Sequence, residues 1–253
     1  MELAFRTSGT GFPVVILHGV FGSGDNWLTV TKALAQHYTI YLPDQRNHGR
    51  SPQSGEFTYA AMAADLLEFF DKHNLQKAHL IGHSMGGKVA MLFAGLYPER
   101  IEKLIVVDIS PRYYAPHHSS ILAGLNAMNL ETLQSRQDAD NQLAPYIPEP
   151  DVRAFLLKNL YRDESSKFAW RINLPVITAN IENIGEALPP HTIIEVPALF
   201  MRGELSNYIT DADWEEIKRI FTRSQLATIA GSGHWVQAEK PVEFVSEAMK
   251  FLA

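Results

Sequence analysis

The sequence contains no cysteine, so its composition excludes disulfide bonds, a thiolate nucleophile and metal centres held by thiolates. Long hydrophobic runs are also missing, since the longest, Val14–Leu17 and Leu104–Val107, are far too short to span a bilayer. The first residues, MELAFRTSGTG, lack the basic stretch and apolar core of a signal peptide. We therefore expect a cytoplasmic protein with no membrane span, and the absence of cysteine is compatible with that compartment.

Positive charge is scarce as well. The 253 residues include 22 Lys and Arg against 28 Asp and Glu, which gives a formal net charge of −6, and no Lys/Arg run is visible. This balance argues against a nucleic-acid partner and against an anchor for anionic membranes. With 46% hydrophobic and 20% charged residues, the chain is long enough to bury a substantial core. Its oligomeric state is not indicated.

Short apolar runs rich in β-branched residues recur along the chain. They occupy residues 13–19, 38–44, 78–84, 103–110, 196–203 and 225–231. Runs without polar alternation fit strands that are covered on both faces, as in a parallel sheet. Between them lie apolar stripes with helical spacing: Trp27, Val30 and Leu34; Met62, Leu66, Phe69 and Phe70; Met85, Val89, Phe93 and Leu96; Trp214, Ile217 and Phe221; and the residues after Pro241. This alternation predicts an α/β fold with helices on both faces of the sheet.

The alternation stops between about Pro111 and Glu195. Helix-like stretches near 117–140 and 151–161 are followed by the proline-interrupted segments INLPVITANI and EALPPHT. Because this segment follows one predicted strand and precedes the next, we expect an inserted cap rather than a separate domain. Connections of this length in compact domains usually serve function. The predicted division is a core of residues 1–110 and 196–253 with a cap of residues 111–195.

Gly82-His83-Ser84-Met85-Gly86 matches G-x-S-x-G, between a predicted strand and a predicted helix. A sharp turn there requires small flanking residues, and it would project the Ser84 hydroxyl at the carboxyl edge of the sheet. The helix that follows would point backbone N–H groups at the same place. Ser84 is therefore the candidate nucleophile.

Among 10 histidines, His234 is the best candidate base, because it follows the last strand in the Gly-rich loop AGSGHWVQAEKP. Structural or surface positions are expected for His37, His73, His79, His83 and the pair His117–His118. The acid is less clear from the residues alone. Glu204 follows the strand before the last, and Asp108 ends the strand after the nucleophile helix; Asp211 and Asp213 are placed to cap a helix.

Taken together, these motifs resemble the α/β-hydrolase superfamily. LHGVFGSGDNW is similar to its oxyanion loop, and DQRNHGRSP to its D-x-R-G-x-G-x-S segment, with Asn47-His48 as a variant. RNHG, with HGVFGS, GHSMGGK, DISP and GHWV, resembles the YbfF-type bacterial esterases and their mitochondrial relatives. The resemblance implies a mostly parallel sheet of about seven or eight strands with a small helical cap.

The same resemblance also implies roles for individual residues. Many members of the superfamily carry an aspartate where this chain has Ser206, whereas the YbfF-type branch places its acid at the position of Asp108. The implied triad is then Ser84, Asp108 and His234. Backbone N–H groups of Val20 and Met85 would bind the oxyanion, with Phe21 in place of Val20 if the loop is shifted by one residue.

The expected activity is hydrolysis of carboxylic esters or acyl thioesters through an acyl-enzyme, without a metal or organic cofactor. Aromatic residues are expected to line an apolar acyl pocket, with Phe21, Trp170, Tyr208 and Trp235 as candidates. The pairs Asp44/His48 and His79/His83 have i,i+4 spacing, but they cross strand ends, so a metal site is not expected. Three alternatives remain: carbon–carbon bond hydrolysis, cofactor-free perhydrolysis, and a ligand receptor with the hydrolase fold.

Overall fold

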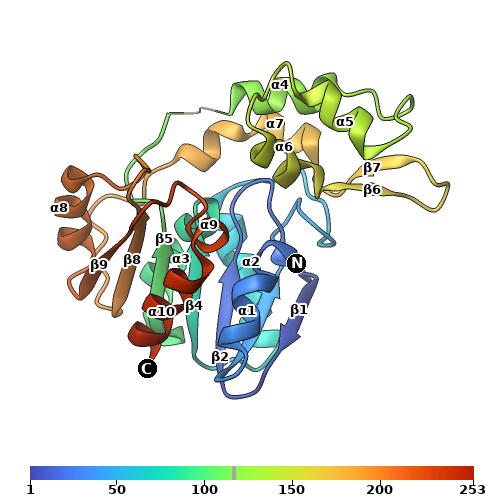
Figure 1. Cartoon of the computed structure of the whole chain (residues 1–253). Coiled ribbons are helices and arrows are strands. Elements are labelled where there is room, and N and C mark those ends of the chain that lie inside the picture. Colours follow the sequence, from blue (N-terminus) through green and yellow to red (C-terminus); the bar gives the residue numbers. More distant parts are fainter. Residues whose placement is uncertain (116–117) are drawn as a thin grey trace.

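A central sheet organises the computed structural model, which describes residues 1–115 and 118–253 (Figure 1). Within these residues the sheet has seven strands in the order β1-β3-β2-β4-β5-β8-β9. Their bounds are β1 Phe5–Ser8, β2 Phe12–Leu17, β3 Tyr38–Pro43, β4 Ala78–His83, β5 Ile101–Val107, β8 Ala198–Gly203 and β9 Ser224–Ile229. All neighbours are parallel except β1, which pairs antiparallel with β3. The six predicted strands and the mostly parallel sheet are confirmed.

Strand β1 was not predicted, because all four of its side chains are exposed and FRTS contains no apolar run. It lies at one edge of the sheet, where its register pairs Phe5 with Pro43 and Ser8 with Ile40. Main-chain pairing with β3, rather than burial of its side chains, therefore defines this strand.

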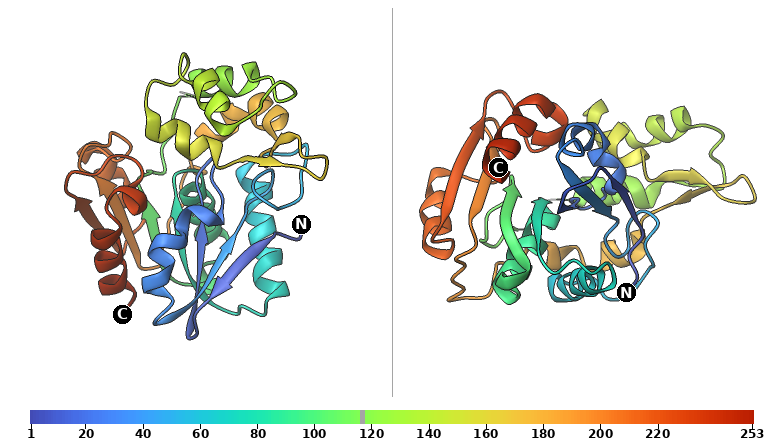
Figure 2. Two further views of the ribbon diagram at one scale, coloured as in Figure 1. Left: turned by 45° about the vertical axis from the view of Figure 1, so that its right-hand side comes forward. Right: turned by 90° about the horizontal axis from the view of Figure 1, so that it is seen from below.

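Helices cover both faces of the sheet. On β2, Val14 and Ile16 belong to one hydrophobic cluster, while Val15 and Leu17 belong to the other. The first cluster includes residues of α1 (Leu28–Leu34) and α10 (Pro241–Leu252), and the second includes residues of α2 (Tyr59–Lys72), α3 (Met85–Leu96) and α8 (Asp211–Ile220). Figure 2 shows these two helical layers in the view from below. Burial on both faces is why the strand sequences are apolar without alternation.

Shorter elements complete the core: η1 Gly24–Trp27, η2 Pro98–Arg100 and α9 Val236–Glu239. The predicted capping role of Asp213 is confirmed, since its carboxylate accepts the Thr210 N–H while its own N–H donates to Thr210 Oγ1. Asp211 starts α8 and pairs with Arg202 at 2.8 Å. In the described part of the chain, no helix combines the length and hydrophobicity that a bilayer crossing needs.

The segment between β5 and β8 lies above the sheet in Figure 1. It contains α4 Ser119–Ala127, α5 Arg136–Leu143, α6 Pro150–Leu157, the hairpin β6 Leu160–Arg162 and β7 Phe168–Trp170, α7 Leu174–Ala179 and η3 Ile181–Gly185. The helices expected near 117–140 are two helices separated by a loop, and the hairpin was not predicted. His117 lies outside the described residues. We call residues 111–195 the cap; the division from the core stays a prediction.

Candidate active site

Ser84 occupies a sharp turn between β4 and α3. Its φ of 52° and ψ of −120° are unusual for a residue with a side chain. A Cβ atom on Gly82 would lie 2.3 Å from the Gly86 carbonyl oxygen, and one on Gly86 would lie 2.5 Å from the Leu17 carbonyl oxygen. The two glycines are therefore required because α3 closely approaches β4 and β2. Ser84 itself is half-buried at the edge of the sheet.

The structure brings together Asp108 and His234, which lie 126 residues apart in the sequence. Asp108 follows β5 and is fully buried, and its Oδ2 lies 2.7 Å from Nδ1 of His234 in the loop after β9. The rival acid, Glu204, accepts the Gly231 N–H at 2.8 Å and holds the same loop from another side. Of the two carboxylates considered, Asp108 is the one bonded to the imidazole.

Two further donors converge on the Asp108 carboxylate. The Gly203 N–H donates to Oδ1 at 3.1 Å, and the Ser206 hydroxyl donates to Oδ2 at 2.5 Å. Burial raises the pKa of Asp108 to about 6, while the hydrogen bonds from Ser206 and Gly203 act in the opposite direction. Ser206, which stands where many superfamily members place their acid, therefore supports the carboxylate on the neighbouring strand.

The imidazole of His234 is held by other rings. Tyr208 stacks on it with centroids 3.9 Å apart and an interplanar angle of 19°, and the His83 ring lies 4.6 Å away. Nε2 of His83 donates to the His234 carbonyl oxygen at 2.9 Å, and burial lowers the pKa of His83 to about 3. His83 is thus a neutral structural residue, as expected. His79 is buried, His73 packs against Phe5 and Phe69, and His37 is exposed.

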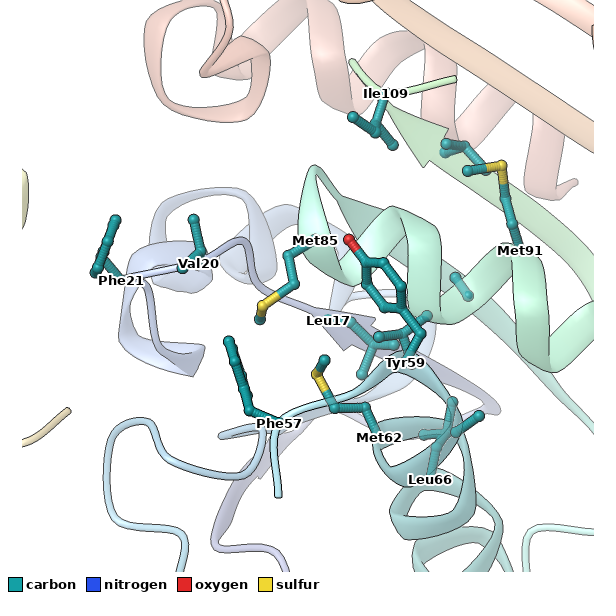
Figure 3. Packing of buried hydrophobic residues seen from close by; sticks show 14 of the residues in the cluster. Leu17, Val20, Phe21, Phe57, Tyr59, Met62, Leu66, Met85, Met91 and Ile109 are labelled. Carbon is teal, nitrogen blue, oxygen red and sulfur yellow. The ribbon is translucent and has the colours of Figure 1, made fainter. Parts of the chain in front are cut away.

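The loop after β2 passes directly beside Ser84. A Cβ atom on Gly19 would lie 3.2 Å from the Ser84 Cβ atom. In the view of Figure 3, Val20 of this loop lies between Phe21 and Met85, the first residue of α3. The Phe21 N–H donates to Nε2 of His48 at 3.1 Å, so this amide is already engaged. That bond favours the Val20 N–H over the Phe21 N–H as an oxyanion donor, together with the Met85 N–H.

A cavity of about 750 Å³ opens over Ser84 and His234, between this loop and the cap. Of the four predicted pocket residues, Phe21, Tyr208 and Trp235 line it. Trp170 does not, which corrects that expectation. It lies in β7 opposite Leu160, and its half-buried side chain packs against a hydrophobic cluster instead. The cap contributes further apolar lining side chains, namely Ile121, Ile147, Val152, Phe155 and Leu156.

The DQRNHGRSP segment is tied to the core by charge and backbone contacts. Arg46 forms a buried ion pair with Asp65 at 2.6 Å, and the Asp44 carboxylate accepts the N–H groups of Gly24 and Arg50. These contacts give Asp44 and Arg46 structural roles. In residues 1–115 and 118–253, no group of three or more His, Cys, Asp or Glu is arranged to hold a metal ion.

Several supporting residues were missed by sequence analysis, namely Ser206 beside the acid, His48 and Asn159 beside the oxyanion loop, and the buried Lys88 on α3. The motif D-x-R-G-x-G-x-S drew attention to His48 without indicating its partner. Asn159 carries no local signal, because its contact crosses 138 residues of sequence.

Comparison with known proteins agrees with this geometry. A family model described as the alpha/beta hydrolase fold matches residues 13–241. The sn-1-specific diacylglycerol lipase ABHD11 of Danio rerio is 38% identical, over 98% of this chain and 80% of that protein. Esterase YbfF of Escherichia coli (strain K12) is 37% identical, over 95% of this chain and 92% of that protein.

A solved structure described as a marine microorganism esterase gives a TM-score of 0.96 at 44% identity, over 99% of both chains. The resemblance to YbfF-type esterases, which rested on RNHG and the accompanying motifs, is confirmed by these matches. The chain belongs to the α/β-hydrolase family, in the branch of the YbfF-type esterases.

Proposed function

We propose that the protein is a serine hydrolase that cleaves carboxylic esters through an acyl-enzyme, with Ser84 as nucleophile, His234 as base and Asp108 as acid. The observation that carries this proposal is the 2.7 Å contact between Nδ1 of His234 and the buried Asp108 carboxylate. This contact selects the imidazole tautomer with its proton on Nδ1, which leaves Nε2 as the basic nitrogen. Relatives named as esterases and lipases support ester hydrolysis over the alternatives.

In the proposed mechanism, Nε2 of His234 takes the Ser84 proton as Oγ attacks the acyl carbon. The oxygen of the tetrahedral intermediate accepts hydrogen bonds from the Val20 and Met85 N–H groups, and one such donor typically contributes about 3 kcal/mol. Collapse of the intermediate breaks the ester bond, and His234 returns the proton to the leaving alcohol. Water then attacks the acyl-enzyme with His234 again as base, and free Ser84 is regenerated.

Acyl thioesters are a second substrate class that we propose, because the same acyl-enzyme forms whether an alcohol or a thiol leaves. A panel of acyl chain lengths, each offered as a simple ester and as a CoA thioester, would compare the two classes. We also propose a cytoplasmic location, as predicted from the sequence.

Turnover of p-nitrophenyl butyrate by the parent, Ser84→Ala, Asp108→Asn and Glu204→Gln proteins tests the proposed function. We expect kcat to fall by about 10⁴-fold or more for the first two variants, because they remove the nucleophile and the group that fixes the base. Glu204→Gln is the control, since a glutamine oxygen can still accept the Gly231 N–H; its activity should stay near the parent value. Retained turnover in Ser84→Ala would refute the proposal.

A further inference from the structure

We propose that Asn159 of the cap and His48 of the core are positioning residues that clamp the oxyanion loop, so that a complete oxyanion hole requires the cap to be seated. This inference rests on the proposed function. Its starting point is Phe21, which has a φ of 59° although it is not glycine. Such a conformation is strained for an aromatic residue and persists only where the surroundings hold it in place.

Both backbone polar groups of Phe21 are held. Its N–H donates to Nε2 of His48 at 3.1 Å, and its carbonyl oxygen accepts a hydrogen bond from Nδ2 of Asn159 at 2.7 Å. His48 is fully buried and Asn159 is 4% exposed, so water does not compete freely for either bond. The strained residue is therefore clamped from the core on one side and from the cap on the other.

The core side of the clamp is built to accept a hydrogen bond. Nδ1 of His48 lies 2.9 Å from the Arg46 carbonyl oxygen, which requires the ring proton to be on Nδ1 and leaves Nε2 as an acceptor. Burial lowers the pKa of His48 to about 3, so the ring stays neutral over the pH range in which an esterase is assayed.

The cap side of the clamp is rigid. Asn159 lies between α6 and β6, where its N–H donates to the Leu156 carbonyl oxygen at 3.1 Å and its carbonyl oxygen accepts the Arg171 N–H at 2.8 Å. Its Nδ2 also lies 3.2 Å from the Leu156 carbonyl oxygen. The side chain is thus fixed within the cap before it reaches across to Phe21.

A second bridge supports the same region. Asn47, next to His48, has a φ of 65°, and its backbone carbonyl accepts the Asn173 N–H from the cap at 2.9 Å. Its Oδ1 lies 3.0 Å from Nδ2 of Asn173. A glycine at position 47, as in D-x-R-G-x-G-x-S, would lack this side-chain bridge. The Asn47-His48 pair therefore joins the cap, through Asn47, to the oxyanion loop, through His48.

The clamp acts on the residue next to the proposed donor. The peptide plane between Val20 and Phe21 is fixed by the bond to His48, which restricts rotation about Val20 and hence the direction of the Val20 N–H. Complete loss of one oxyanion donor typically lowers kcat by about 10²–10³-fold. A loop that is loosened rather than lost should lower kcat by about 10–100-fold.

The test compares Asn159→Leu with Asn183→Leu. Both asparagines belong to the cap and donate from Nδ2 to a core carbonyl oxygen, but the partner of Asn183 is Phe57, at 2.9 Å, and not the oxyanion loop. For each variant, kcat and KM for p-nitrophenyl butyrate, Tm, and Ki for an alkyl boronic acid are measured. The boronic acid forms a tetrahedral adduct with an active serine and so reports on the oxyanion site.

For Asn159→Leu we expect kcat to fall by about 10–100-fold with KM changed by less than about 3-fold. Ki for the boronic acid should rise by a factor similar to the loss in kcat. Asn183→Leu should stay within about 3-fold of the parent in kcat and Ki. If Asn159→Leu does not fold, His48→Phe removes the core side of the clamp and is measured in the same way, with the same expectation.

Equal losses in the two leucine variants, or an unchanged Ki in Asn159→Leu, would overturn the clamp. The Ser84→Ala variant separates this outcome from failure of the proposed function. If Ser84→Ala is inactive while Asn159→Leu keeps its kcat and its boronic acid affinity, the clamp is wrong and the hydrolase is not. If Ser84→Ala is active, the proposed function itself fails.

Discussion

Asp108 directly follows β5, and its carboxylate accepts hydrogen bonds from the Gly203 N–H, the Ser206 hydroxyl and Nδ1 of His234. A fully buried carboxylate is costly unless such partners compensate for the lost water. Burial is the larger effect here, because the pKa of Asp108 is raised to about 6. The hydrogen bonds therefore hold the Asp108 side chain in place, while its burial raises the pH at which the carboxylate becomes protonated.

This balance predicts how activity depends on pH. Because the pKa is raised, the Asp108 carboxyl takes up a proton as the pH falls through about 6, and kcat/KM should fall with it. Ser206→Ala removes a hydrogen bond that lowers this pKa, so the half-point of the acid limb should move to higher pH. This half-point is the pH at which kcat/KM reaches half of its maximum, and pH profiles of kcat/KM measure it. Because Asp108 and His234 are hydrogen-bonded, it describes the two groups together rather than one of them.

The control for this experiment is Ser246→Ala, on the exposed side of α10. That variant should keep the parent profile. An acid limb that stays in place in Ser206→Ala would show that the hydroxyl does not stabilise the charged carboxylate.

At the scale of single elements, α3 matters because its first turn presses against β2. A Cβ atom on Gly86 would lie 2.5 Å from the Leu17 carbonyl oxygen and 2.6 Å from the His18 carbonyl oxygen. Backbone atoms of a central strand cannot move aside without shifting the oxyanion loop that follows it. The position of Ser84, the proposed nucleophile, and the position of the loop are thus set by the same contact.

We therefore expect Gly86→Ala to lower the free energy of unfolding by about 1–3 kcal/mol and to reduce kcat strongly. Gly95→Ala, near the other end of α3, is the matched control. There the nearest atom is Cγ2 of Thr192 at 3.3 Å, and alanine favours the helix. Its effect on stability should stay within about 1 kcal/mol, as measured by urea unfolding. Equal effects of the two substitutions would contradict this account of the turn.

Helix α3 also carries Lys88, whose buried ammonium donates to the carbonyl oxygens of Arg112 and Glu186. These carbonyls lie toward the two ends of the cap segment, so Lys88 joins the core helix to the cap. Burial lowers the pKa of Lys88 to about 7, so between pH 7 and about 10 the unfolded chain binds more protons than the folded one. Stability from this group therefore rises with pH in that window.

Lys88→Met removes this titration. We expect the difference in Tm, parent minus variant, to become more positive as the pH rises from 7 to 9. Thermal unfolding at matched ionic strength measures it, with Lys250→Met, at an exposed position of α10, as the control. A difference that does not change with pH would rule out the lowered pKa.

At the scale of the whole molecule, core and cap enclose the cavity over Ser84 together. Trp235, from the core loop that carries His234, contacts Phe155 of α6 with ring centroids 5.6 Å apart. Both rings line the cavity, whereas Trp170, in β7 of the cap, does not. The two tryptophans therefore give a matched pair of substitutions.

Trp235→Ala should enlarge the cavity and shift the preference toward longer acyl chains, seen as a changed ratio of kcat/KM between p-nitrophenyl butyrate and octanoate. We expect a shift of about 10-fold, the range typical of changes in a hydrophobic pocket. Trp170→Ala should leave the ratio unchanged. The same ratio in both variants would show that Trp235 does not contact the acyl chain.

The sequence predicted those features that are encoded locally. Ser84 and its glycines lie within five residues, and the apolar runs of the six parallel strands report burial on both faces. Asp108 and Glu204 remained alternatives from the residues alone, because both follow adjacent strands of the sheet and only side-chain direction separates them. Strand β1 was missed since its pattern is set by pairing, not by burial.

Contacts between core and cap were beyond prediction for a different reason. The bond from Asn159 to Phe21 spans 138 residues, and the sequence around neither residue indicates the other. Trp170 was expected in the pocket on the basis of residue type, but the β6–β7 hairpin directs it elsewhere. Such contacts depend on how the cap is placed over the sheet, and no local pattern records that placement.

Covalent labelling with an alkyl fluorophosphonate, followed by mass spectrometry of the intact protein and its peptides, tests the central claim most directly. We predict one adduct per chain, on the peptide that contains Ser84, with loss of ester turnover in proportion to labelling. Ser84→Ala should take up no label. An adduct on another residue, or ester turnover that survives complete labelling of Ser84, would contradict the account.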